Sequence, residues 1–433
     1  MTSIQSKRVV VDGEVRPARV VFHDGVVASI DSPGIADHDF GDLVIMPGLV
    51  DSHVHVNDPG RASWEGFATA TRAAAAGGTT TIVDMPLNSI PPTTSVPALK
   101  EKRGAAAGHL SVDVAFWGGL IPGSLPGMGP LADEGVCGFK AFLVDSGVPE
   151  FPPVTVQEIT AGMSRLAALG LPMLVHAEDP ASLRDPDGDP RVYSTYVDSR
   201  PVESEVRAVE IVAGVAERAG ASAHILHVSS GDAADAVARG RSLSGETCPH
   251  YLTFSANEIA NGATAYKCAP PIRESSHREA LWDALRVGHL LMVVSDHSPA
   301  PTEIKEVESG NFLEAWGGIA SLQIRLPAVW HGASERGFDL ATIARWLAAA
   351  PAQLAGLSER KGSIQVGLDA DLVVWDPDGV TEIRAETLEH RHPLSPYEGM
   401  RLRGTVITTI LRGSVVFGDG TVMGSRGRML RRR

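Results

Sequence analysis

Eight short apolar runs recur through the middle of the chain, and their spacing constrains the fold more than any other feature of the sequence. The runs lack polar alternation, and the segments between them include Ala-rich stretches with helical periodicity, such as residues 65–78. Strands that are apolar on both faces are typical of parallel sheets that helices cover on both sides. Eight strand and helix units predict an α/β fold, a (β/α)8 TIM barrel. The runs are LVIMPGLVDSHVH (43–55), TTTIVDMP (79–86), VDVAFWGG (112–119), CGFKAFLV (137–144), PMLVHAE (172–178), AHILHVSS (223–230), GETCPHYLTF (245–254) and LMVVSDHSP (291–299).

The two ends of the chain have a different pattern from its middle. Residues 1–46 and 363–433 alternate β-branched runs with turn signals, and the Asp-Gly pair in ARVVFHDGVVASID marks a tight hairpin. Neither end alone has enough strands to bury a core. We therefore expect both ends to pair into one small β-sandwich beside a barrel of residues 47–362.

Charge and cysteine content narrow the classes of partner. The 433 residues carry a formal net charge of -14, which disfavours nucleic acid and anionic membranes, because these partners require a basic patch. The basic C-terminus, RGRMLRRR, is the exception, and we expect it to be a solvated tail. Cys137, Cys248 and Cys268 lie far apart and form no CxxC motif, so neither a disulfide framework nor a thiolate zinc site is predicted. With no leader-like or membrane-spanning apolar stretch, we expect a cytoplasmic protein.

Side chains that can bind metal ions end several of the eight runs. His53 and His55 are one residue apart on a strand, so they point to the same face and can share a cation. His176 and His227 end two later strands, and Asp296 ends the eighth. Because the carboxyl ends of barrel strands meet at one mouth, these residues predict a metal site, in which Asp296 serves as ligand, general base or both.

Two further histidines lie near these residues but are predicted to have other surroundings. His224 is three residues from His227, so strict alternation along the strand makes it face the helices. His297 follows Asp296 directly and is expected to face away from the site. We interpret His224 as structural.

Lys140 is the most informative single position. A lysine ammonium has three donors and no acceptor, so it would repel metal ions held by the histidines. A neutral amine, with its pKa lowered by burial and nearby positive charge, can instead add carbon dioxide and become a carbamate with two oxygens. The alternative is a lysine whose head reaches solvent or an ion pair at the mouth of the barrel.

These motifs carry a resemblance to a known family. The segments PGLVDSHVHV (47–56), GFKAF (138–142), HAE, HVS, SDH and GLDADLVVWD (367–376) resemble the cyclic amidohydrolases of the binuclear metal amidohydrolase superfamily, and the likeness covers nearly the whole chain. It implies that His53, His55 and Asp296 bind one metal ion, that His176 and His227 bind a second, and that Lys140, as N6-carboxylysine, binds both.

The resemblance also implies an activity. The expected metal is zinc, although nitrogen and oxygen ligands also accept cobalt, manganese or iron. A hydroxide that bridges the two metal ions would attack the carbonyl of a cyclic amide, and Asp296 would act as base and then as acid toward the departing ring nitrogen. Relatives of this kind imply a homo-oligomer, a dimer or a tetramer.

The substrate depends on residues outside the metal ligands. Residues 53–94 and 138–153 resemble the allantoinase family, which opens the hydantoin ring of allantoin to allantoate in purine degradation. Dihydroorotases resemble HxHxR at this point, where an arginine holds the substrate carboxylate. Asn57 stands there in this chain and suits a neutral ureido group, although Arg61 could supply the missing charge. The alternatives are another cyclic amidase, either a dihydroorotase or a hydantoinase/dihydropyrimidinase, or a scaffold without catalysis.

Further substrate contacts are expected in the loops of the barrel mouth. The glycines among them would bring the backbone close to a ligand, but turn chemistry alone also explains Asn and Gly in loops. Glu178 and His250 are predicted to orient metal ligands. The predicted substrate-binding residues are Asn57, Asn88, Cys268, Ser298, Gly317 and Gly318.

Overall fold

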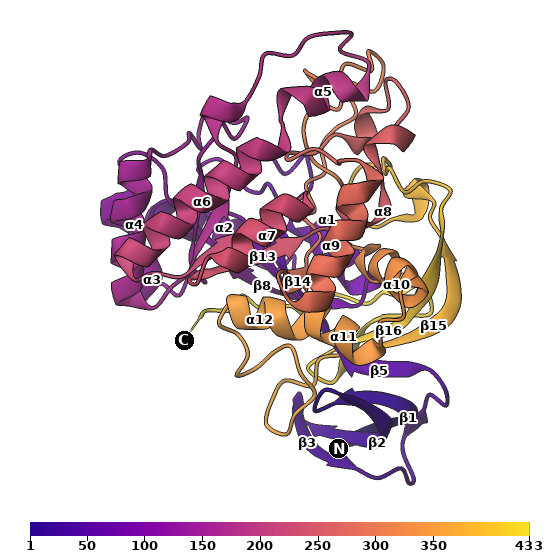
Figure 1. The fold of residues 1–433 in the computed structure, drawn as a ribbon. Coiled ribbons are helices and arrows are strands. Elements are labelled where there is room, and N and C mark those ends of the chain that lie inside the picture. Colours follow the sequence, from indigo (N-terminus) through magenta and orange to yellow (C-terminus); the bar gives the residue numbers. More distant parts are fainter. Residues whose placement is uncertain (433) are drawn as a thin grey trace.

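A set of parallel strands forms the centre of the fold in the computed structural model, which describes residues 1–432 (Figure 1). All eight apolar runs contain residues of these strands, and the run at 112–119 contributes two of them, which confirms the predicted parallel α/β organisation. Arg433, the last residue of the basic C-terminus, lies outside the described residues. The strands are β6 (Leu49–Val54), β7 (Thr79–Asp84), β8 (Asp113–Phe116), β9 (Gly118–Gly119), β10 (Phe139–Phe142), β11 (Met173–His176), β12 (Ala223–Ile225), β13 (Leu243–Thr247) and β14 (Met292–Val293).

These strands pair in two parallel sheets that meet at both edges. One sheet has the order β6-β7-β8 and the other has the order β14-β13-β12-β11-β10-β9. On one side, the backbone N–H of His55 donates to the carbonyl of His297 over 2.8 Å. On the other side, the N–H of Cys137 donates to the carbonyl of Phe116 over 2.9 Å. The first and the last parallel strands are therefore neighbours.

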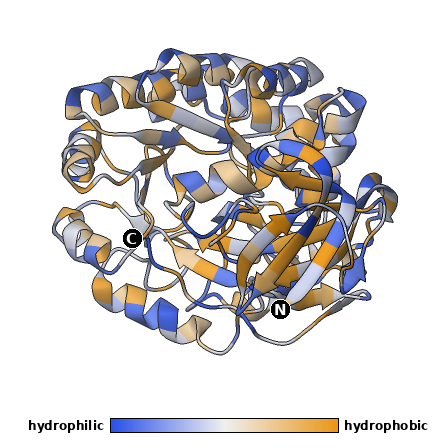
Figure 2. Cartoon of the chain, turned by 90° about the horizontal axis from the view of Figure 1, so that it is seen from below, coloured by the Kyte–Doolittle hydropathy of each residue, from blue (hydrophilic) through white to orange (hydrophobic). Residues whose placement is uncertain are grey.

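Helices follow the parallel strands in sequence and lie at the periphery when the molecule is viewed from below (Figure 2). Local signals explain their bounds. Thr155 and Glu158 form a capping box at the start of α4, and Gly170, with φ +64°, ends it. The helices are α1 (Phe67–Ala76), α2 (Val96–Ala106), α3 (Met128–Asp133), α4 (Val156–Leu169), α5 (Tyr193–Ser199), α6 (Val202–Ala219), α7 (Gly231–Arg239), α8 (Pro249–Thr253), α9 (Ser275–Val287), α10 (Arg325–Glu335), α11 (Leu340–Ala344) and α12 (Ala350–Leu354). No helix of residues 1–432 is long and apolar enough to cross a membrane.

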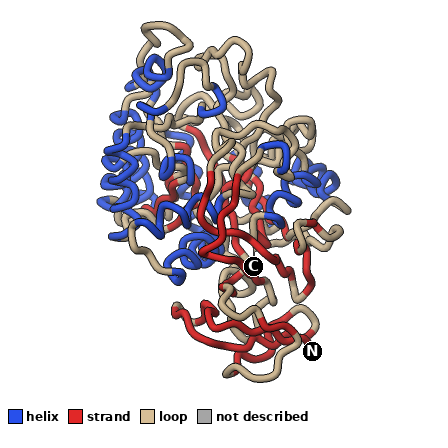
Figure 3. Tube along the Cα trace, turned by 90° about the vertical axis from the view of Figure 1, so that its right-hand side faces the viewer, coloured by secondary structure: helices blue, strands red, loops and turns tan. Residues whose placement is uncertain are grey.

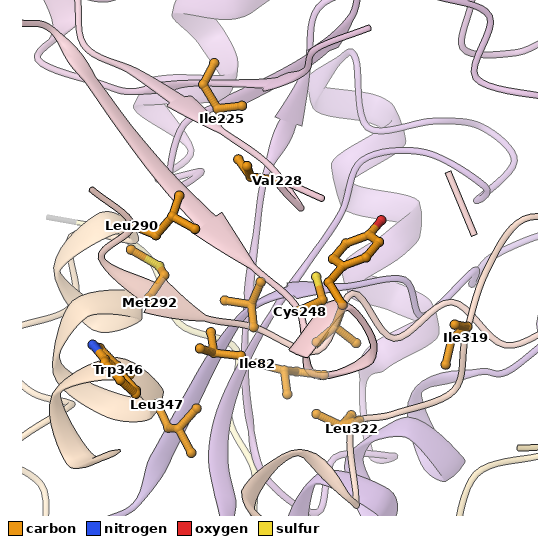
Figure 4. Close-up of a cluster of buried hydrophobic side chains, with 14 of the residues drawn as sticks. Ile82, Ile225, Val228, Cys248, Leu290, Met292, Ile319, Leu322, Trp346 and Leu347 are labelled. Atoms are coloured by element: carbon orange, nitrogen blue, oxygen red, sulfur yellow. The ribbon is translucent and has the colours of Figure 1, made fainter. Parts of the chain in front are cut away.

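The apolar core joins strands and helices that are distant in sequence. Ile82 of β7, Ile225 of β12 and Met292 of β14 belong to one buried cluster with Trp346 and Leu347, which precede α12 (Figure 4). The strand runs lack polar alternation because they pack against such neighbours on both faces. Their packing fixes the strand ends, from which the functional side chains project.

The N- and C-terminal segments pair in one sheet, as their β-rich composition predicts. Its order is β18-β17-β16-β15-β5-β1-β2-β3, with β4 beside β1. Asp12-Gly13 and Asp24-Gly25 turn the two hairpins of the N-terminal part, all four residues having positive φ. The strands are β1 (Thr2–Val11), β2 (Glu14–His23), β3 (Val26–Asp31), β4 (His38–Asp39), β5 (Val44–Pro47), β15 (Leu372–Glu382), β16 (Arg401–Leu411), β17 (Ser414–Gly418) and β18 (Thr421–Val422). The first apolar run is thus divided between β5 of this sheet and β6 of the parallel set.

Much of the loop trace gathers at the end of the molecule opposite the N-terminus (Figure 3). The short helix α5, which follows β11, lies at this end in Figure 1. Loops at the carboxyl ends of parallel strands are where such folds build their sites. The histidines and the aspartate that the sequence singles out lie at these strand ends.

The basic C-terminus is not a solvated tail, so that prediction is wrong. The N–H of Val114 in β8 donates to the carbonyl of Arg428, and the N–H of Leu430 donates back to the carbonyl of Val114. Leu430 is buried, while Met429 is 38% exposed. The prediction rested on the charges of the tail and did not consider Leu430, whose buried side chain fixes the tail against the parallel strands.

A buried ion cluster fixes β8 close to the tail. Lys361 Nζ lies 2.7 Å from Asp113 and 2.5 Å from Asp371, and the N–H of Arg428 donates to the other Asp113 oxygen over 2.8 Å. Asp113, Asp369 and Asp371 lie close enough together to hold a metal ion, but the Lys361 ammonium already bonds to all three carboxylates. The cluster is therefore a structural connection between the sheets and not a metal site.

We predict that Leu430→Ala lowers the free energy of unfolding by about 2–5 kcal/mol, because the change leaves a cavity beneath the tail. Met429→Ala, next to it and partly exposed, should change that free energy by less than about 1 kcal/mol. Urea-induced unfolding followed by circular dichroism measures both variants. Equal stability of the two variants would contradict the inserted position of the tail.

Candidate metal centre

The end of β6 brings three of the predicted ligands together. His53 Nε2 lies 3.1 Å from Asp296 Oδ1, and His55 Nε2 lies 3.6 Å from the same oxygen. All three side chains are buried, and their ligand atoms lie within 4.8 Å of one another. Alternation along the strand places both imidazoles on one face, as the HxH spacing predicts.

His176 and His227 form a second pair beside the first. His176 Nδ1 lies 2.9 Å from His227 Nε2, and the ring centroids of His53 and His227 are 5.4 Å apart. The structure thus brings together the four histidines and the aspartate that the sequence singles out, from strand ends up to 243 positions apart, His53 to Asp296.

Two of these residues have an uncommon backbone conformation. His227 has φ +37° and Asp296 has φ +45°, a region that costs energy for residues other than glycine. Side chains therefore no longer alternate between the two faces of the strand at His227 and Asp296. Both side chains instead line the cavity described below.

Lys140 lies among the histidines with its head buried. Its Nζ is 3.4 Å from His53 Nε2, and the residue is 1% exposed. Among the described residues no carboxylate forms an ion pair with it. Burial lowers the pKa of Lys140 to about 8, so the neutral amine is far more accessible near neutral pH than it is for an exposed lysine. The alternative in which the head of Lys140 reaches solvent is wrong.

The donor set fits divalent cations. Burial foremost, and then the charge of Lys140, lower the pKa of His55 to about 3, and burial keeps the pKa of His227 well below its ordinary value. Burial alone would raise the pKa of Asp296, but the neighbouring histidines, His53 foremost, hold it well below its ordinary value. Neutral imidazoles and an ionised carboxylate, buried together, are the forms that bind zinc and similar ions. His227 Nδ1 is buried without a hydrogen-bond partner among residues 1–432.

Cys248 and His250 form a second possible ligand group with Asp296, but it fits a metal ion less well. Burial raises the pKa of the Cys248 thiol well above its ordinary value, and a protonated thiol is a poor ligand. Neither ring nitrogen of His250 has a hydrogen-bond partner among the described residues. The role of His250 in orienting ligands therefore stays a prediction.

A buried carboxylate that the sequence interpretation missed orients His53. Glu246 Oε1 lies 2.6 Å from His53 Nδ1, and its other oxygen lies 3.1 Å from His224 Nε2. His224 thus faces the inside of the strand set and not the helices, because the chain leaves strand geometry before His227. The available signal was an acidic residue within the apolar run GETCPHYLTF, where an unpaired carboxylate would be costly.

Glu178 contacts His176 of the second pair, as a residue that orients a metal ligand would. Its Oε2 lies 2.6 Å from His176 Nε2, which leaves Nδ1 of that ring for a metal ion. The same oxygen lies 3.2 Å from Arg200 Nη2. Burial opposes ionisation, yet Arg200 and His176 lower the pKa of Glu178 to about 2. His297 turns away from the cavity, as predicted, and its Nδ1 accepts from the N–H of Ser321.

The candidate ligands line one side of a cavity at the carboxyl ends of the parallel strands. Asn88, Ser298 and Gly317 lie on its wall, as expected for substrate contacts, and Asn88 Nδ2 lies 3.4 Å from His55 Nδ1. The lining residues are His55, Leu87, Asn88, Lys140, Phe142, Asp145, Ser146, His176, Arg200, His227, Ala269, Asp296, Ser298, Trp316 and Gly317.

Three predicted substrate contacts do not line this cavity. Asn57 is buried with φ +66°, and its Nδ2 donates to the carbonyl of Pro299 over 3.5 Å. Cys268 Sγ donates to the carbonyl of Pro270, and a side chain on Gly318 would clash with the carbonyl oxygen of Ser298. A left-handed turn explains Asn57, and close backbone packing explains Gly318, so both types of residue have a local structural cause.

Arg61 does not supply a charge to the cavity. Its guanidinium donates to the carbonyl of Asn88 and to the carboxylate of Glu150, and the residue does not line the cavity wall. The idea that Arg61 replaces the arginine of HxHxR is therefore wrong. The arginine that does reach the cavity is Arg200, which the sequence interpretation missed because it follows α5 and belongs to no motif.

Comparison with known proteins agrees with this site. A model of the amidohydrolase family matches residues 44–416. The chain belongs to the amidohydrolase family. Its relatives include an allantoinase from Streptomyces avermitilis, 45% identical over 99% of this chain and 98% of that protein. An allantoinase from Arabidopsis thaliana is 43% identical over 96% of this chain and 88% of that protein.

Solved structures resemble the whole chain. An L-hydantoinase (dihydropyrimidinase) from Arthrobacter aurescens is 31% identical, with a TM-score of 0.92 over 100% of both chains. A D-hydantoinase is 27% identical, with a TM-score of 0.90 over 100% of this chain and 99% of that one. The sequence relatives are thus named as allantoinases, and the structural neighbours are named as hydantoinases.

We predict that Glu246→Gln weakens metal binding by about 10- to 100-fold, because the amide removes the charge that orients His53 and places an N–H₂ group near one of the two histidines. Competition with a chromogenic chelator measures the affinity. Glu210→Gln, on the exposed face of α6, is the matched control and should leave the affinity unchanged. Equal affinities of the two variants would contradict the orienting role.

Proposed function

We propose that the protein is an allantoinase, which opens the hydantoin ring of allantoin by hydrolysis and releases allantoate. The observation that carries the proposal is the identity of 41–45% to allantoinases of a streptomycete, a plant and a yeast over at least 96% of this chain. The histidines and Asp296 line one cavity together with the polar side chains of Asn88 and Ser298, as a site for a small polar ring requires.

The proposal assigns metal ligands to this chain's own residues. His53, His55 and Asp296 would hold one metal ion, His176 and His227 a second, and Lys140, as a carbamate formed with carbon dioxide, would bridge the two. The close approach of His53 to Lys140 and to Asp296 supports this assignment. When bound, two divalent ions, zinc by preference, would make water a stronger nucleophile and polarise the substrate carbonyl.

The side chains around the cavity would perform the remaining steps. Asp296 would take a proton from the attacking water and give it to the ring nitrogen as the amide bond breaks. Asn88 and Ser298, both on the cavity wall, would hold polar groups of the ring. Glu246 and Glu178 would keep the imidazoles of His53 and His176 in one orientation and tautomer.

A hydantoinase-like or dihydroorotase-like specificity has weaker support. The L-hydantoinase (dihydropyrimidinase) from Arthrobacter aurescens is 31% identical to this chain, against 45% for the Streptomyces avermitilis allantoinase. A dihydroorotase holds the substrate carboxylate with the arginine of HxHxR, but Asn57 stands at that position in this chain and Arg61 is engaged with Glu150. All six ligand positions are present, which argues against a scaffold without catalysis.

The finer architecture is part of the same proposal. We propose that residues 47–362 form a (β/α)8 barrel and that residues 1–46 and 363–433 form a β-sandwich. The meeting of the two parallel sheets at both edges supports the barrel. We also propose a homo-oligomer in the cytoplasm, and the free cysteines Cys137, Cys248 and Cys268 fit a reducing compartment.

We predict that the purified protein, supplied with divalent metal and bicarbonate, opens allantoin with a kcat/KM at least about tenfold above that for dihydroorotate, hydantoin or dihydrouracil. The reason is that the polar groups of the cavity wall require partners on the substrate. Ring opening followed by ultraviolet absorbance and by chromatography measures each rate. A higher kcat/KM for any of the other rings would refute the allantoinase assignment.

We predict that Lys140→Ala removes bound metal and lowers kcat by about 100-fold or more, because the bridging ligand is lost. Short carboxylic acids added to this variant should restore part of both, since a carboxylate can occupy the place of the carbamate. Elemental analysis and the allantoin assay measure the two effects. Unchanged metal content in the variant would exclude a bridging role for Lys140.

A further inference from the structure

Arg200 lines the metal-side cavity but is not used by the mechanism above. Its side chain is 17% exposed, and its only ion pair among the described residues joins Nη2 to Glu178. No hydrogen bond from its guanidinium to residues 1–432 is present, and Nε is buried without a partner. A largely buried guanidinium has five N–H donors to satisfy, so these free donors indicate a ligand.

A second, outer cavity adjoins the first at this arginine. Residues shared by both walls are Asp145, Ser146, Arg200, Ala269, Trp316 and Gly317. Arg200 therefore stands where the outer cavity opens into the inner one. A molecule bound at the metal ligands would extend any substituent toward this boundary.

Asp145 faces the same boundary with the opposite charge. The carboxylate of Asp145 and the guanidinium of Arg200 both line the wall that the two cavities share. Among the described residues Arg200 pairs with Glu178 and not with Asp145. Asp145 Oδ1 accepts from the N–H of Gly147 over 3.0 Å, and the residue is exposed. Donors and an acceptor thus flank one space without satisfying each other.

A ureido group has the matching chemistry. Its carbonyl oxygen accepts hydrogen bonds, and its nitrogens donate them, so it can satisfy a guanidinium and a carboxylate at once. In allantoin the ureido group is carried by the ring carbon bonded to the carbonyl that water attacks. The group must therefore lie close to the metal ligands, and Arg200 is separated from His176 only by the carboxylate of Glu178.

We propose that Arg200 and Asp145 form a subsite for the ureido substituent, in which Arg200 donates to the ureido carbonyl and Asp145 accepts from the ureido N–H groups. The inference rests on the proposed function and goes beyond it by naming the residues that determine specificity. A ring without the substituent leaves this pair unsatisfied, so the subsite favours ureido-substituted hydantoins over plain hydantoin.

The test compares allantoin with hydantoin, which has the same ring without the ureido group. Hydantoin is measured as a substrate, or as a competitive inhibitor of allantoin where its turnover is too slow. The metal-loaded variants Arg200→Met and Asp145→Ala are compared with Glu246→Gln, which disturbs His53 but lines neither cavity and makes no contact with Arg200. Asp198→Ala, an exposed carboxylate on α5 that lines neither cavity, is the matched control for Asp145→Ala.

We expect Arg200→Met to lower the preference for allantoin over hydantoin by about 10- to 100-fold, mainly through KM for allantoin, because hydrogen bonds to a charged group are lost. Asp145→Ala should lower the same preference by several-fold and Asp198→Ala should not change it. Glu246→Gln should weaken catalysis with both rings to the same extent and leave the preference unchanged.

Two results would overturn the inference, and they have different meanings. If Arg200→Met and Asp145→Ala leave the preference for allantoin unchanged while the wild-type protein opens allantoin, the subsite is wrong and the proposed function stands. If the wild-type protein does not open allantoin at all, the proposed function is wrong and the subsite falls with it. Because Asp145 is exposed, its variant tests the subsite even if Arg200→Met fails to fold.

Discussion

The close approach of basic side chains in one buried volume is the constraint on which the site depends. His53, His55, His176, His227 and Lys140 meet at the strand ends, almost wholly removed from water. Burial opposes a positive charge on these groups, so the pKa of His55 falls to about 3 and that of Lys140 to about 8. The pKa of His53 is raised despite its burial, because the carboxylates of Asp296 and Glu246 lie beside it. Such a set of lone pairs is stable only with cations between the donors or with compensating carboxylates behind them. Glu246 and Glu178 are the carboxylates, and the two proposed metal ions are the cations.

The carboxylates behind the histidines connect the site to the fold. Glu246 links His53 of β6 to His224 of β12, and Glu178 links His176 of β11 to Arg200 after α5. Each joins segments distant in sequence and fixes an imidazole that would otherwise rotate. Arg200 takes part in two functions, since it compensates Glu178 and offers its remaining donors to the cavity. The contacts from His176 through Glu178 to Arg200 thus connect the proposed metal site to the proposed ureido subsite.

The sequence was sufficient to predict the parallel strands and the residues that meet at their ends. His53 and His55 share a strand face, and the carboxyl ends of parallel strands converge whatever the loops do. The predicted orientation of His224 was wrong because His227 adopts a left-handed backbone conformation, which the sequence pattern does not predict. Glu246 and Arg200 were missed because their roles come from partners more than 20 residues away in sequence. The basic tail shows the reverse error, because its charges suggested exposure while one buried leucine fixes the segment. The substrate role of Asn57 stays a prediction, and its left-handed backbone is a second reason for an asparagine there.

The central claim is that two metal ions and a carboxylated lysine occupy this volume, and anomalous X-ray diffraction at the zinc edge from crystals grown with zinc and bicarbonate tests it most directly. The account predicts two anomalous peaks, one beside His53, His55 and Asp296 and one beside His176 and His227. It also predicts extra electron density on Lys140 Nζ that reaches both peaks. A single peak, a peak at Cys248 and His250, or an unmodified Lys140 between two metal ions would contradict the account.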